Sequence, residues 1–92
     1  MDKIKQANKW LEETTDRYFE IEINVCGESR KVFTKLDADK KHIVCVWIHP
    51  NEKNPRCSIE MNPVEPLSLM YGKIIQKSFW TEQFNYFKNM CS

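Results

Sequence analysis

Hydrophobic residues recur at three- and four-residue spacing over residues 2–17, which predicts an amphipathic helix. Asp2 is placed to cap its N-terminus. The residues that share the apolar face are Ile4, Ala7, Trp10, Leu11 and Thr14. Three acidic residues lie near its C-terminal end, where the helix dipole disfavours negative charge: Glu12, Glu13 and Asp16.

From Tyr18 the period of the pattern changes to two, which predicts strands. Residues 18–25 alternate apolar and polar, Gly27 lies in a turn, and residues 30–36 return as a second strand. A polar loop over residues 37–41 leads to residues 42–49, which are apolar on both faces and therefore predict a central strand. A loop with two prolines follows over residues 50–56, and residues 57–61 alternate as a fourth strand.

Residues 62–65, Asn-Pro-Val-Glu, carry the signals of a helix start, although Pro66 can move that start forward. A helical stripe follows, made of Val64, Leu67, Tyr71, Ile74 and Ile75. A second stripe contains Phe84, Phe87 and Met90 or Cys91, so the segment is one bent helix or two, and we favour a break near Ser78. The expected order is α-β-β-β-β-α-α. The chain of 92 residues is expected to be a single α+β domain, residues 1–92, with a four-stranded antiparallel meander.

Composition excludes several functions. The formal net charge of +1 argues against an acidic DNA mimic and against binding through an overall basic field. Two glycines cannot build a glycine-rich phosphate loop, and the longest apolar run, residues 43–48, is too short to span a membrane. The charged N-terminal residues lack the apolar core of a signal peptide, so we expect a cytoplasmic protein.

The four cysteines, Cys26, Cys45, Cys57 and Cys91, contain no C-x-x-C pair, and in the cytoplasm we expect them to be reduced. On a strand, Cys45 and His49 would lie about 13 Å apart, too far to share a zinc ion. No metal site and no cofactor are therefore expected.

No catalytic residues are expected either. A cysteine nucleophile needs an adjacent histidine and a third, orienting group, and neither Cys26 nor Cys45 has the placement that activates a thiol. Glu20 and Glu22 form a carboxylate pair on the outward face of the first strand, where no cleft is expected. We expect a protein that is not an enzyme.

Charge is unevenly distributed, because residues 1–29 carry a net −3 and residues 30–56 a net +4. The leading hypothesis is a module that binds another protein or a second copy of itself. Its expected apolar anchors are Tyr18, Phe33 and Trp47, with a charged rim of Arg30, Lys31, Lys53 and Arg56. If all helices cover one sheet face, the other face exposes Trp47 or Val46; if the first helix covers the second face, nothing is exposed.

The alternative is an RNA-binding domain that uses the basic loops of residues 30–56, with Lys40, Lys41 and His42 as contacts. In size and in its lysine- and asparagine-rich composition, the chain also resembles small bacteriophage proteins that disable host factors. That resemblance implies stoichiometric inhibition of a host enzyme by occlusion.

Overall fold

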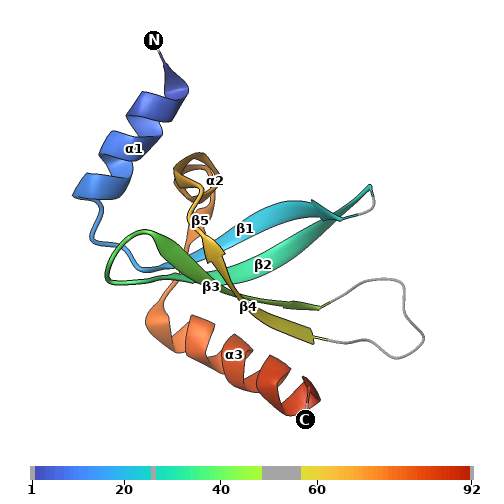
Figure 1. Cartoon of the computed structure of the whole chain (residues 1–92). Helices are drawn as coiled ribbons and strands as arrows, with labels where there is room; N and C mark the ends of the chain where they lie inside the picture. The colour runs from blue at the N-terminus through green and yellow to red at the C-terminus, as the bar shows by residue number, and fades with distance from the viewer. Residues whose placement is uncertain (1, 26, 49–56, 92) are drawn as a thin grey trace.

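The computed structural model describes residues 2–25, 27–48 and 57–91, and its elements follow the predicted α+β class (Figure 1). The elements are α1 (Lys3–Glu13), β1 (Tyr18–Val25), β2 (Glu28–Leu36), β3 (His42–Ile48), β4 (Cys57–Pro63), α2 (Pro66–Met70), β5 (Lys73–Ile74) and α3 (Lys77–Cys91).

The strands form one antiparallel sheet in the order β4-β3-β2-β1-β5. The four-stranded meander is confirmed, and so is the interior position of β3, which follows from its apolar residues on both faces. The two-residue strand β5 was not predicted. It adds to β1 through the pairs Phe19↔Ile74 and Glu20↔Lys73.

Helices cover both faces of the sheet, so the molecule has three layers (Figure 1). On the α1/α2 face, Leu11 of α1 and Leu69 of α2 pack on Phe19 and its neighbours, and the Trp10 ring meets the Phe19 ring edge-on at 5.9 Å. On the α3 face, Trp80 and Phe87 are buried against the opposite side of the sheet. Val46, on this second face, is completely buried.

The predicted helix start at Asn62 is wrong, because Asn62 and Pro63 extend β4 and pair with Ile43 and His42. The Val64 N–H then donates to the Lys41 carbonyl at 2.9 Å, which continues the pairing with the chain beside β3. The helix begins at Pro66, as the proline allows. Long-range strand pairing thus overrides the local capping signal.

The predicted helical stripe through Ile74 and Ile75 is also wrong in its second half. The helix α2 ends at Met70, and the chain passes Gly72 and returns to the sheet as β5. A Cβ atom at Gly72 would lie 2.7 Å from Ile21 Cγ2, so only glycine permits this close approach. The expected break between two helices exists, but it lies at residues 71–76, and Ser78 is already inside α3, which begins at Lys77.

The first helix has the predicted start but ends earlier than residue 17. Asp2 caps it by accepting a hydrogen bond from the Ile4 N–H at 2.9 Å. The helix α1 ends at Glu13, because the backbone of the next residue, Thr14, is extended. Lys40, in the β2–β3 turn, donates from Nζ to the carbonyls of Glu12 and Thr14, each at 2.9 Å. This ammonium group supplies the positive charge that the acidic end of α1 lacks.

Candidate functional site: a cleft between two hairpins

The sheet consists of two hairpins that are joined only at one end. The ladder between β2 and β3 runs from Leu36↔Ile43 to Phe33↔Val46, whereas within each hairpin pairing continues to Val25↔Glu28 and to Ile48↔Cys57. Beyond Phe33, the described part of β2 pairs with β1 alone. The β1–β2 and β3–β4 hairpins therefore diverge toward their tips (Figure 1).

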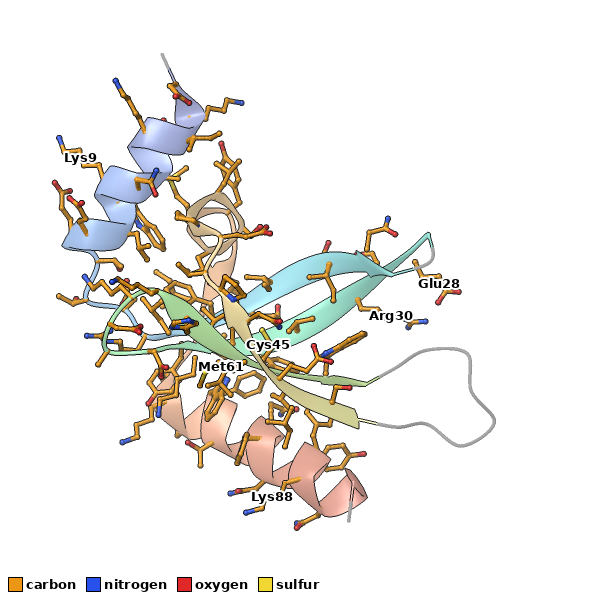
Figure 2. All side chains as sticks on the ribbon, in the orientation of Figure 1. Lys9, Glu28, Arg30, Cys45, Met61 and Lys88 are labelled. Atoms are coloured by element: carbon orange, nitrogen blue, oxygen red, sulfur yellow. The ribbon has the colours of Figure 1, made fainter. Side chains whose placement is uncertain are left out.

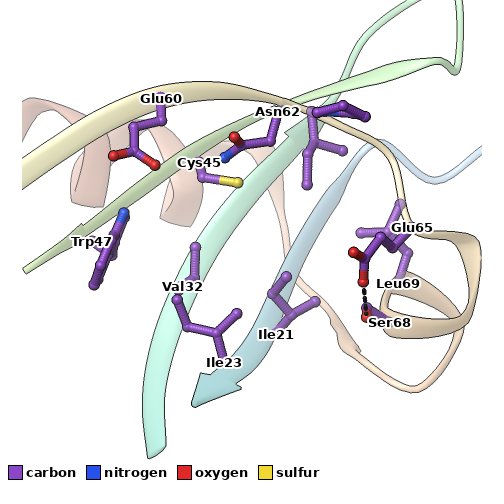
Figure 3. A pocket seen from close by; sticks show the side chains of 12 residues that line it. Ile21, Ile23, Val32, Cys45, Trp47, Glu60, Asn62, Glu65, Ser68 and Leu69 are labelled. Carbon is purple, nitrogen blue, oxygen red and sulfur yellow. Dashed lines mark hydrogen bonds between the residues drawn. The ribbon is translucent and has the colours of Figure 1, made fainter. Parts of the chain in front are cut away.

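A hollow of about 340 Å³ lies on the α1/α2 face between these hairpins, and we call it the cleft. Its apolar wall comes from Ile21, Ile23 and Val32 of the first hairpin and from Ile43, Cys45 and Trp47 of the second. Leu69 of α2 closes one end. Polar side chains stand at its rim: Glu60, Asn62, Glu65 and Ser68 (Figure 3).

Strand alternation explains why these side chains meet. Successive side chains point to opposite faces, so the register places Ile21, Val32 and Cys45 on the same face. The helices α1 and α2 pack on the end of that face near Phe19 and Leu36, and a hollow bordered by Ile23 and Trp47 remains beyond them (Figure 3). The cleft is therefore a hollow on the part of one sheet face that these two helices do not fill.

The rim of the cleft is acidic. Glu60 on β4 and Glu65 at the start of α2 are both exposed, and Glu65 accepts a hydrogen bond from Ser68 Oγ at 3.2 Å. Among the described residues, those that line the cleft include these two carboxylates and no lysine, arginine or histidine. An apolar floor with a negative rim favours an apolar group that carries positive charge beside it.

Cys45 lies in the wall of the cleft, but its chemistry is that of a packed thiol. Burial raises the pKa of the Cys45 thiol above its ordinary value of 9.0; a hydrogen bond with the Asn62 side chain opposes this, and the charge of Glu60 adds to it. A protonated, buried thiol is a poor nucleophile. His42 lies on the opposite face of β3, where its Nδ1 is 3.1 Å from Asp39 Oδ2.

The predicted apolar anchors do not come together. Trp47 is buried in the wall of the cleft, whereas Tyr18 and Phe33 lie on the α3 face. There the Tyr18 ring is 5.6 Å from that of Trp80, and the Phe33 ring is 5.7 Å from that of Phe79. Helices cover both faces of the sheet, so no face is left entirely exposed. The α1/α2 face, however, is covered only in part.

The predicted charged rim is also divided. Arg30 lies on the α1/α2 face and pairs with Glu28 of the same strand, near the tip of the first hairpin (Figure 2). Lys31 lies on the opposite face, across from Glu22. Lys53 and Arg56 fall outside the described residues, as does His49.

The residues of the alternative RNA site take part in local contacts. Lys40 caps α1, and Asp39 holds the next turn by accepting from the Lys41 N–H at 2.8 Å and by pairing with His42. The Lys41 N–H, followed by His42, lowers the pKa of the Asp39 carboxyl. Of the three predicted contacts, Lys41 is exposed, whereas Lys40 and His42 are half-buried.

Sequence reasoning missed most of the cleft. The period-two pattern assigns Ile21 and Ile23 to one face, but nothing local predicts that α2 stops short of covering them. Glu60 and Glu65 belong to no sequence motif of a binding site, and the sequence indicates Glu65 only as part of a helix cap. The carboxylate pair Glu20 and Glu22 lies on the α3 face, away from the cleft.

Within the described ranges, no group of three or more histidine, cysteine or acidic side chains is arranged to hold a metal ion. None of the described helices is long and apolar enough to cross a membrane. No protein-family model matches the chain, and no match is found among curated proteins or solved structures.

Proposed function

We propose that this protein is a non-enzymatic binding module whose cleft receives apolar side chains from a basic segment of another protein. The observation that carries the proposal is the cleft on the α1/α2 face, where an apolar wall containing Trp47 is bordered by Glu60 and Glu65. The partner inserts side chains between the two hairpins, so Trp47 forms part of the receiving wall.

The dimensions of the cleft support this function. A hollow of about 340 Å³ holds a few large apolar side chains, and a small number of such anchors dominates the binding energy of most interfaces. Rim charges steer association and select the partner more than they add affinity. Lysine or arginine beside the inserted residues would therefore meet the carboxylates of Glu60 and Glu65.

Binding of this kind acts by occlusion, with one module covering one surface of its target. We therefore propose a stoichiometric inhibitor or modulator of a host factor, as small phage proteins are. We place its action in the cytoplasm, where buried thiols such as that of Cys45 stay reduced.

The decisive variant is Ile23→Glu, which puts a carboxylate into the apolar wall. Ile75→Glu is the matched control, because Ile75 is also half-buried but lies outside the cleft, between β5 and α3. The wild type and both variants are immobilised and exposed to cell lysate with and without nuclease treatment, and the retained proteins are then purified for titration. Circular dichroism checks that both variants fold.

We expect one target to be retained by the wild type and by Ile75→Glu, and its affinity for Ile23→Glu to fall at least about tenfold. Glu65→Lys should slow association with the same target and weaken its dependence on salt. Equal affinity of a folded Ile23→Glu variant would refute the cleft as the binding site. Retention that collapses on nuclease treatment, with RNA released, would replace this proposal with the RNA-binding alternative.

A further inference from the structure

We infer that the outer edge of β4 pairs with β4 of a second copy of this chain, in antiparallel orientation, with Ile59 opposite Ile59 of the second copy. This interface goes beyond the proposed cleft function, because it uses the backbone of an edge strand, although Glu60 of that strand also lies at the rim of the cleft.

The strand β4 lies at the end of the sheet, and in the described structure it has a strand on one side only. Val64 and Lys41 form a hydrogen-bonded pair, because the Val64 N–H donates to the Lys41 carbonyl. Along an antiparallel ladder, hydrogen-bonded pairs alternate with non-hydrogen-bonded pairs. Ser58, Glu60 and Asn62 therefore direct their backbone groups toward β3. The outward groups belong to Cys57, Ile59, Met61 and Pro63.

The side chains beside this edge are apolar and exposed. Ile59 is 43% exposed and Met61 is 63% exposed, and both lie on the α3 face (Figure 2 labels Met61). Natural sheets usually protect an edge strand with lysine, proline or a bulge. Of these protective features, β4 has only Pro63, at its last position, and it contains no lysine.

Three registers pair at least three of the outward residues with the second copy, and the sequence disfavours two of them. Pairing centred on Glu60 would oppose two carboxylates at the close spacing of a non-hydrogen-bonded pair. Pairing centred on Met61 would place Pro63, which has no N–H, where a donor is needed. Pairing centred on Ile59 avoids both defects, because every outward N–H from Cys57 to Met61 then meets a carbonyl.

The register centred on Ile59 also gives compatible side-chain pairs on the α1/α2 face of the sheet. It places Glu60 directly across from Ser58 of the second copy, twice by symmetry, so each carboxylate faces a small polar residue instead of a second carboxylate. On the α3 face, the two Ile59 side chains cover one another. Self-complementarity of this kind is what a two-fold interface requires, and it identifies a second copy as the occupant.

The other edge of the sheet offers a matched control. Ile74 on β5 is 54% exposed, so Ile59→Lys and Ile74→Lys each place one lysine on an exposed edge isoleucine. Sedimentation equilibrium of the full chain should give a concentration-dependent mass approaching twice 11.0 kDa for the wild type. We expect Ile59→Lys to raise the dimer dissociation constant at least about tenfold and Ile74→Lys to change it less than about twofold.

Amide hydrogen exchange on the wild type tests the register without any substitution. The amides of Ser58 and Glu60 should be protected at every concentration because they bond to β3, whereas those of Ile59 and Met61 should gain protection only as the dimer forms. A wild-type chain that stays monomeric at about 0.5 mM, or a dimer that is unaffected by Ile59→Lys, would overturn the inference. So would protection of Ile59 and Met61 that appears only when a different protein is added.

Discussion

Lys40 combines a stabilising contact with a strained backbone, and the two effects can be separated by substitution. Its φ of 56° lies in the left-handed region, which costs a residue with a side chain about 1 kcal/mol relative to glycine. Against this strain, its ammonium group donates to the Glu12 and Thr14 carbonyls at the end of α1. The turn itself is held by the Lys40 N–H, which donates to the Asp37 carbonyl at 2.9 Å.

Lys40→Ala removes the ammonium group and keeps the strain. Each bond to a helix carbonyl contributes about 0.5–1 kcal/mol at this partly exposed position, so the free energy of unfolding should fall by about 1–2 kcal/mol. Lys40→Gly loses the same bonds but relieves the strain, so it should be more stable than Lys40→Ala by about 1 kcal/mol. Lys41→Ala is the control, because Lys41 contributes backbone bonds that alanine retains, and its effect should stay within about 0.5 kcal/mol.

Urea denaturation followed by circular dichroism measures these differences. In a domain of this size, 1 kcal/mol also corresponds to a shift of about 4–8 °C in Tm. The reasoning is refuted if Lys40→Ala is as stable as Lys41→Ala, or if Lys40→Gly is less stable than Lys40→Ala. A confirmed result would mean that Lys40 is a structural lysine, which weakens its assignment as an RNA contact.

Two further predictions concern packing and pH. Gly72→Ala should destabilise the fold by about 2 kcal/mol in denaturant titrations, because its Cβ would lie 2.7 Å from Ile21 Cγ2. Gly27→Ala, where φ is +82° but no atom lies within 4 Å, should cost only about 1 kcal/mol; equal losses would contradict the steric argument. Because burial raises the pKa of Cys45 above 9.0, the unfolded chain releases this proton first as pH rises, so the stabilising contribution is full below pH 9.0 and is lost above it. The stability difference between wild type and Cys45→Ala should therefore shrink between pH 8 and pH 10, and a constant difference would contradict the assignment.

The sequence by itself determined the elements whose pattern matches their environment. Alternation over residues 18–25 and 30–36 predicted two strands, and the apolar residues on both faces of residues 42–49 predicted that β3 is interior. The Asp2 cap and the division of the C-terminal segment into two helices also followed from local chemistry. These features depend on interactions between residues close in sequence, or on burial that the pattern of apolar side chains indicates directly.

Only the tertiary structure decided how far each local signal extends. Asn62 and Pro63 carry a helix-start signal but form a strand, because pairing with Ile43 and His42 satisfies their backbone beside β3. Ile74 fits a helical stripe but joins β1, because Gly72 lets the chain pass close to Ile21. Both outcomes depend on partners distant in sequence.

The cleft was the least predictable feature. It exists because the β2–β3 ladder stops at Phe33 and because α1 and α2 pack on the end of their face near Phe19 and Leu36. Local pattern assigned Trp47, Tyr18 and Phe33 to one anchor set, but strand register separates them onto opposite faces. Alternation fixes which residues of one strand share a face, whereas the register between strands and the reach of the helices decide which residues meet.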